Sequence, residues 1–201
     1  PVSAEEMEAQ TDDEIVALFK LLHDGQEHHP ENWLKGGSVE ASREFEKFAE
    51  KHQERAMAII ARFVPGSQER PAAHGFEGLH KGGLDKDCLF DMLRELHRKG
   101  FASRDIRHAA ASVLVSRAQS EKGLPDDICG ILRGWLAQFE DASQLEQTVN
   151  GDHAILWGLK GHHILTVISM LLDAIALGYI CRDEPAYPEW LLALNEALAG
   201  S

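Results

Sequence analysis

Helix-capping residues recur along this chain, and apolar side chains at helical spacing follow each of them. Thr11 and Glu14 form a capping-box pattern. Asp85 and Ser103 precede two further amphipathic segments, and Gly100 stands where a left-handed residue closes a helix. Alternating runs of Val, Ile and Thr between turn residues, which would indicate strands, are nearly absent. The sequence therefore predicts an all-α fold of about nine or ten helices.

The predicted helices fall into antiparallel pairs joined by short polar turns. These pairs occupy about residues 11–140. A long loop is predicted over 148–163, because this stretch contains three glycines and has no strong helical period. Two more helices are predicted within 162–198. With 201 residues, the chain 1–201 is expected to form one domain with its own core.

A weak internal repeat connects two of the predicted helices. When Leu84 is aligned with Leu124, an offset of 40 residues, Met92 meets Leu132 and the apolar stripes run in phase. This offset is typical of HEAT-like helix pairs, which bury their apolar stripes by stacking on their neighbours. We therefore expect a HEAT-like α-solenoid segment. The alternative is that two unrelated amphipathic helices align this well by chance.

Composition and charge exclude several classes of protein. Hydrophobic residues make up 44% and charged residues 26%, which is typical of a globular protein. The net charge of −13 argues against general nucleic-acid binding, which requires a surplus of Lys and Arg. A less acidic middle segment, 81–117, is interpreted as solvated helix faces, with a phosphate-binding patch as the alternative.

Other features of the sequence favour a cytoplasmic protein without a membrane segment. The most apolar stretch, 164–179, carries Asp173 and is too short to span a bilayer. The first residues are acidic, whereas a secretory signal begins with basic residues. Three cysteines without a CxxC pattern fit a reducing compartment. Because the chain begins without Met, we also expect that it can be a piece of a longer protein.

No catalytic, cofactor-binding or metal-binding residue is predicted. Eleven histidines are present, but the adjacent pairs at 28–29 and 162–163 cannot form an (i, i+4) metal clamp, and HExxH does not occur. No catalytic signature surrounds Cys88, Cys129 or Cys181. Acidic pairs stand at predicted helix starts, where they favour the helix dipole.

The region 148–163 is the place where we expect a partner to bind, because loops carry function more often than repeat helices. The predicted partner-binding residues combine aromatic and basic side chains: Trp33, His153, Trp157, Lys160 and His162. One alternative is a loop that only packs Trp157 against the last helices. Another is a ligand pocket or an enzyme site in which His153, His162 and Asp173 converge.

One segment is similar to a known family. Gly36-Gly37-Ser38-Val39-Glu40, then Phe45 and Phe48-Ala49-Glu50-Lys51-His52-Gln53-Glu54-Arg55-Ala56, then Gly78-Leu79 and the helix predicted over 84–97, resemble the helical region of large bacterial STAND-type NTPases of antiviral defence. The resemblance covers about residues 12–140 and implies a scaffold and recognition surface. The chain departs from such proteins because GxxxxGK[ST], the nucleotide-binding motif, does not occur in it.

We therefore expect a non-catalytic scaffold or sensor segment that binds a protein partner. The alternative is a small helical ligand-binding domain or enzyme with a pocket near 148–163. A third option, an acidic decoy for a basic groove, rests only on the net charge.

Overall fold

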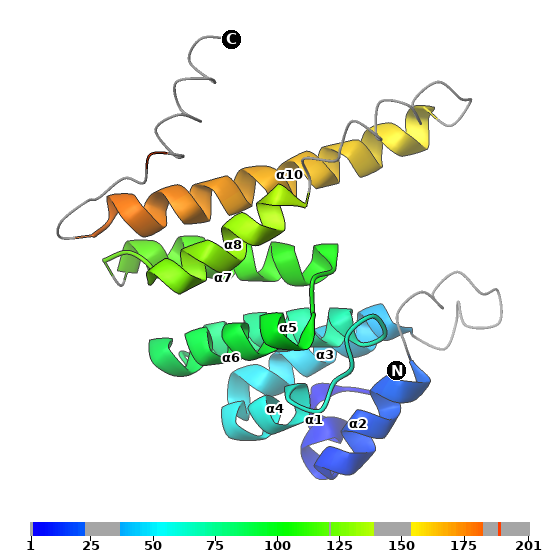
Figure 1. The fold of residues 1–201 in the computed structure, drawn as a ribbon. Helices are drawn as coiled ribbons and strands as arrows, with labels where there is room; N and C mark the ends of the chain where they lie inside the picture. The colour runs from blue at the N-terminus through cyan, green and yellow to red at the C-terminus, as the bar shows by residue number, and fades with distance from the viewer. Residues whose placement is uncertain (1, 23–36, 121, 139–153, 183–188, 190–201) are drawn as a thin grey trace. The chain divides into compact units, whose positions relative to one another are not determined.

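The computed structural model describes residues 2–22, 37–120, 122–138, 154–182 and 189, and of residues 154–166 it describes the backbone alone. Within these ranges every regular element is an α-helix, nine in all, and no strand occurs (Figure 1). The predicted all-α fold is confirmed. The solenoid arrangement stays a prediction.

The chain divides into two compact units, 1–110 and 111–201, and each is described by itself. Unit 1 contains α1 (Ala4–Ala9), α2 (Asp12–Leu21), α3 (Ser38–Lys51), α4 (Gln53–Ile60), α5 (Glu69–Lys81) and α6 (Lys86–Lys99). The helix α7 (Arg104–Ser120) crosses the boundary, and unit 2 contains α8 (Asp126–Ala137) and α10 (Ala154–Ile180). The single domain expected over 1–201 stays a prediction.

The helix caps lie where the sequence places them. At the start of α2, the Glu14 amide donates to Thr11 Oγ1 at 3.3 Å, and the Thr11 amide donates to the Glu14 carboxylate at 2.8 Å. Asp85 accepts from the Asp87 amide at 2.9 Å at the start of α6, and Gly100 ends that helix with a φ of +93°. Each cap satisfies backbone groups that the helix leaves unpaired and contributes about 1 kcal/mol.

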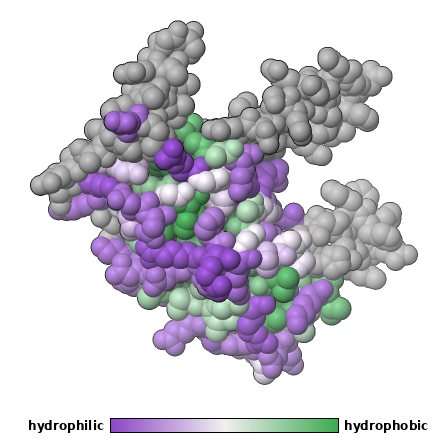
Figure 2. All heavy atoms as spheres, in the orientation of Figure 1, coloured by the Kyte–Doolittle hydropathy of each residue, from purple (hydrophilic) through white to green (hydrophobic). Residues whose placement is uncertain are grey.

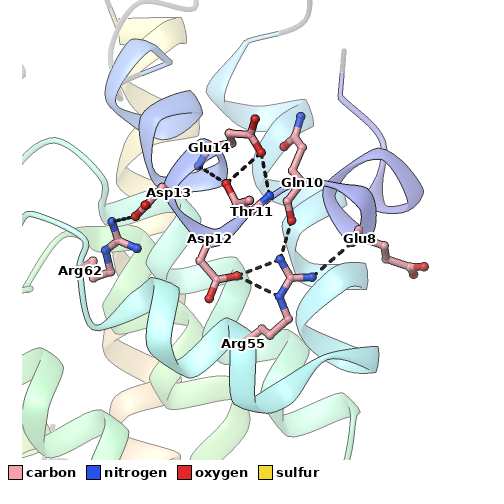
Figure 3. A network of polar contacts seen from close by, with 8 residues as sticks. All are labelled: Glu8, Gln10, Thr11, Asp12, Asp13, Glu14, Arg55 and Arg62. Carbon is pink, nitrogen blue, oxygen red and sulfur yellow. Dashed lines mark hydrogen bonds and ion pairs between the residues drawn. The ribbon is translucent and has the colours of Figure 1, made fainter.

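A polar network ties the turn between α1 and α2 to α4 (Figure 3). Arg55 of α4 donates to the Asp12 carboxylate at 2.9 Å and to the backbone carbonyls of Gln10 at 2.7 Å and Glu8 at 3.3 Å. Its guanidinium also lies 5.1 Å from the ring centre of Phe48. Arg55 therefore satisfies carbonyls at the end of α1 and holds the first two helices against α4.

The core of unit 1 is built around phenylalanines from three segments. Phe19 of α2 and Phe45 of α3 are fully buried, and their ring centres lie 5.4 Å apart in edge-to-face geometry. Phe63, after α4, lies edge-on to both rings at 5.5 and 5.7 Å. Such aromatic pairs add about 0.5–1.5 kcal/mol each beyond the burial of their area.

Two glycines of α5, Gly75 and Gly78, and the C-cap glycine that follows it, Gly82, let this helix pack closely against α3. A Cβ atom added at Gly78 would lie 2.3 Å from the backbone oxygen of Glu46, and one at Gly82 would lie 2.3 Å from that of Glu50. A Cβ at Gly75 would meet the Phe45 ring at 2.7 Å. Positions 75, 78 and 82 share one face of α5. We call this contact, made by Gly75, Gly78 and Gly82 on α3, the glycine seam.

In unit 2, α8 packs against α10, and Trp135 of α8 is fully buried. Gly178 of α10 lies against Leu124 and Cys129, and the Leu124 amide donates to the Gly178 carbonyl at 3.0 Å. The buried apolar residues of α10 follow a helical period: Val167, Leu171, Ala174 and Ile175. No helix in the part of the chain that the structure describes is long and apolar enough to cross a membrane.

The prediction of a loop over 148–163 is wrong for residues 154–163, which belong to α10. Gly158 and Gly161 suggested a loop, but glycine within a helix costs only about 1 kcal/mol relative to alanine. The apolar residues around these glycines outweigh that cost. Residues 148–153 and the helix predicted after residue 186 lie outside the described residues, apart from the helical Glu189.

The internal repeat stays a prediction, but the turns that precede α6 and α8 are alike. These two helices begin 40 residues apart, at Lys86 and Asp126. Gly83 and Gly123, again 40 apart, have left-handed φ angles of +79° and +101°, and the residues after them, Leu84 and Leu124, are buried. The aligned stripes agree only in part: Met92 and Leu132 are both buried, whereas Ile128 is buried and Cys88, the position aligned with it, is exposed.

We predict that Gly78→Ala lowers the free energy of unfolding by about 1–3 kcal/mol, because its methyl group would overlap a backbone carbonyl that cannot rotate away. Gly134→Ala is the matched control, since a Cβ there meets nothing within 4 Å. The free energy of unfolding of this control should rise by up to about 1 kcal/mol, because alanine favours a helix more than glycine does. Urea unfolding followed by circular dichroism measures both changes, and a Gly78→Ala variant as stable as the unchanged protein would contradict the glycine seam.

Candidate functional site

A cluster of four ionisable side chains lies beside the glycine seam. Glu46 comes from α3, and His74, Glu77 and Lys81 come from α5. His74 Nδ1 lies 2.6 Å from Glu46 Oε2 and 3.9 Å from Glu77 Oε2. Lys81 Nζ pairs with the other oxygen of Glu46. Glu46, His74 and Glu77 are 16%, 24% and 23% exposed, so the three lie partly beneath the surface.

Helix geometry explains why these residues meet. His74, Glu77 and Lys81 are spaced i, i+3 and i+7, which places them on one face of α5. Gly78 lies beside that face and brings the backbone of Glu46 against α5. The side chain of Glu46 therefore reaches the α5 residues without crossing open solvent.

The surroundings shift the pKa values of Glu77 and Glu46 in opposite directions. Burial raises the pKa of Glu77, and the neighbouring charge of Glu46 raises it further, while His74, His108 and Lys81 oppose these effects. Burial also acts to raise the pKa of Glu46, but hydrogen bonds from Lys81 and His74 outweigh it and hold this pKa below its ordinary value. Glu46 is therefore the carboxyl group of the cluster that ionises more readily. The ionisation of Glu77 costs free energy.

The donor atoms of this cluster could hold a cation. One imidazole nitrogen and two carboxylate oxygens, from Glu46, His74 and Glu77, all lie within 4.8 Å of one another. Among the described residues this is the group of His, Cys, Asp and Glu side chains with metal-ligand spacing. Sequence analysis missed it, because only His74 and Glu77 are close in sequence and Glu46 lies 28 residues away. The prediction of no metal residue stays a prediction.

The residues predicted to bind a partner are not brought together by any described contact. Trp157, Lys160 and His162 lie on α10, where the structure describes only the backbone. His153 and Trp33 lie outside the described residues. The partner site and the alternative pocket therefore both stay predictions.

A second polar cluster closes unit 2. Arg182 donates to the carbonyls of Gly178 at 3.0 Å and Leu124 at 2.5 Å, pairs with Asp126 at 2.8 Å, and lies 4.4 Å from the ring centre of Tyr179. It thereby links the end of α10 to the start of α8. Burial raises the pKa of the adjacent Cys129 thiol. A raised pKa lowers the fraction of thiolate, the nucleophilic form of the side chain, at neutral pH.

A comparison of the chain with protein-family models, with curated proteins and with solved structures found no match in any of the three. What the structure itself defines is an all-α protein of two compact units. Within unit 1, a histidine–carboxylate cluster lies beside a close helix–helix contact.

The raised pKa of Glu77 predicts how stability depends on pH. The folded protein holds this proton more tightly than the unfolded chain, so stability is lost as the pH rises from the ordinary pKa of 4.5 through the folded value. Glu77→Gln cannot ionise and should raise the free energy of unfolding at pH 7, whereas well below pH 4.5 the difference should vanish.

Glu46→Gln provides the opposite control for this measurement. The lowered pKa of Glu46 contributes stability that is present at neutral pH and lost as the pH falls through its folded value. Glu46→Gln should therefore lower stability at pH 7. Urea unfolding at both pH values checks these signs, and equal effects of the two substitutions at pH 7 would contradict the assignment.

Proposed function

We propose that this chain is a non-catalytic scaffold or sensor segment that binds a protein partner. The observation that supports the proposal is a recurring turn, in which a glycine with a left-handed φ angle precedes a buried leucine at 83–84 and again 40 residues later at 123–124. Helix pairs that recur at this spacing occur in repeat proteins, which offer extended surfaces to their partners.

The surface of the described residues fits such a function. On the face drawn in Figure 2, hydrophilic residues cover most of the described surface, with small hydrophobic areas between them. Exposed ion pairs on α6, Asp91 with Arg94 and Glu95 with Arg98, alternate charges along one helix. Exposed ion pairs contribute little to stability. The charged side chains of this surface are therefore available to contact a partner.

The proposal includes the resemblance to the helical region of bacterial STAND-type defence NTPases. If it holds, the nucleotide-binding motif that this chain does not contain belongs to another part of the same protein or to its partner. A partner that carries GxxxxGK[ST] and is captured with this chain would support this part of the proposal.

The experiment is capture of partners from the source cells, followed by binding measurements with each purified candidate. The proposal predicts a stoichiometric protein partner whose affinity falls about tenfold or more in Trp157→Ala, as expected when an aromatic anchor is removed. Lys47→Ala, a change at a side chain that is 62% exposed, is the control and should leave the affinity unchanged.

Two results would contradict the proposal. One is a purified chain that binds no protein and instead copurifies with a small molecule, which would favour the ligand-binding alternative. The other is a partner that binds Trp157→Ala, Trp33→Ala and the unchanged chain equally well, which would move the interface away from the predicted residues. Circular dichroism of each variant controls for loss of fold.

A further inference from the structure

We infer that Glu46, His74 and Glu77 form a binding site for a divalent first-row transition-metal ion, with Zn²⁺ as the ion to test. This site goes beyond the scaffold function and does not depend on it. The inference rests on the donor atoms, on their spacing and burial, and on the way the glycine seam fixes the helices that carry them.

The donor set is suited to this class of ion. One imidazole nitrogen and two carboxylate oxygens are common ligands of Zn²⁺ in proteins, and sites with three protein ligands leave a position open for water or another ligand. Imidazole disfavours Mg²⁺ and Ca²⁺, which prefer oxygen ligands alone. The site therefore selects a transition-metal ion by ligand chemistry.

The spacing is close to what coordination needs. Bonds of about 2.0–2.2 Å in a tetrahedral site set neighbouring donor atoms about 3.3–3.6 Å apart. His74 Nδ1 lies 2.6 Å from Glu46 Oε2 and 3.9 Å from Glu77 Oε2, so one pair lies on either side of this range. The third pair, Glu46 with Glu77, has donor atoms within 4.8 Å of each other, so the site requires side-chain rotations that bring all three pairs into this range.

The backbone of the site is held rigid by the seam. Gly78 places α3 and α5 in direct backbone contact next to Glu46 and Glu77. Two ligands, His74 and Glu77, come from successive turns of one helix, and the third comes from the helix packed against it. Preformed positions of this kind reduce the ordering that an ion would otherwise have to impose.

The negative charge of the two carboxylates also favours the binding of a cation. Two carboxylates flank His74. Lys81 pairs with Glu46, and His74 and His108 also act on Glu77. Lys81 is 55% exposed and can swing into solvent when an ion takes its place. The ammonium of Lys81 is therefore a competitor for the ion, and its removal should strengthen binding.

The test is calorimetric titration of the full chain with Zn²⁺, after treatment with a chelator and removal of any tag. The expected result is one tightly bound Zn²⁺ per chain, with at least about tenfold weaker binding in His74→Asn and in Glu77→Gln. His97→Asn, on the exposed face of α6, is the matched histidine control and should bind as the unchanged chain does.

The Lys81→Met variant tests the proposal most sharply, because we expect it to bind Zn²⁺ more tightly than the unchanged chain. A folding defect would weaken binding and so could not produce this result. Glu77→Gln is expected to be more stable than the unchanged chain at pH 7, so weaker binding in that variant cannot come from unfolding. The proposal is overturned if the unchanged chain binds no Zn²⁺, or if His74→Asn and Glu77→Gln bind it as well as the unchanged chain. An affinity that falls in Lys81→Met would also overturn it.

Discussion

The direct contact between the backbones of α3 and α5 is the constraint on which unit 1 depends. Helices ordinarily pack with their axes about 8–10 Å apart, because side chains fill the space between them. Here Gly78 of α5 and Gly82 at its C-cap have no side chains, and the carbonyls of Glu46 and Glu50 occupy the space that side chains would fill. At Gly75 the ring of Phe45 occupies that space. Contacts between a glycine Cα–H and a carbonyl add a small favourable term at such interfaces.

This contact builds both the core and the polar cluster. On one side of the seam, Gly75 lies against the buried ring of Phe45, which belongs to the phenylalanine core. On the other side, Glu46 lies next to His74 and Glu77. The burial that stabilises the aromatic rings also partly desolvates both carboxylates, which acts to raise both pKa values. The hydrogen bonds that Glu46 receives from Lys81 and His74 lower its pKa and so separate it from that of Glu77. Any function of the cluster is therefore coupled to the packing of the core.

Local features of the structure could be predicted from the sequence, and distant pairings could not. The caps at Thr11 and Asp85 and the left-handed Gly100 follow from short patterns, because their hydrogen bonds span only a few residues. Glycine misled the prediction at 154–163, where it lies within a helix. The cluster was missed because Glu46 and His74 are 28 residues apart. The spacing of Gly75, Gly78 and Gly82 was the one available signal of a close helix contact.

The most direct test of the glycine seam is the nuclear Overhauser spectrum of the isotopically labelled protein. Backbone-to-backbone packing places the Hα protons of Gly78 next to the backbone protons around Glu46, and those of Gly82 next to the backbone protons around Glu50. We predict strong cross-peaks between these backbone protons in the native protein. Their absence, with cross-peaks from Gly78 only to side-chain protons of α3, would show an ordinary helix spacing and contradict the account.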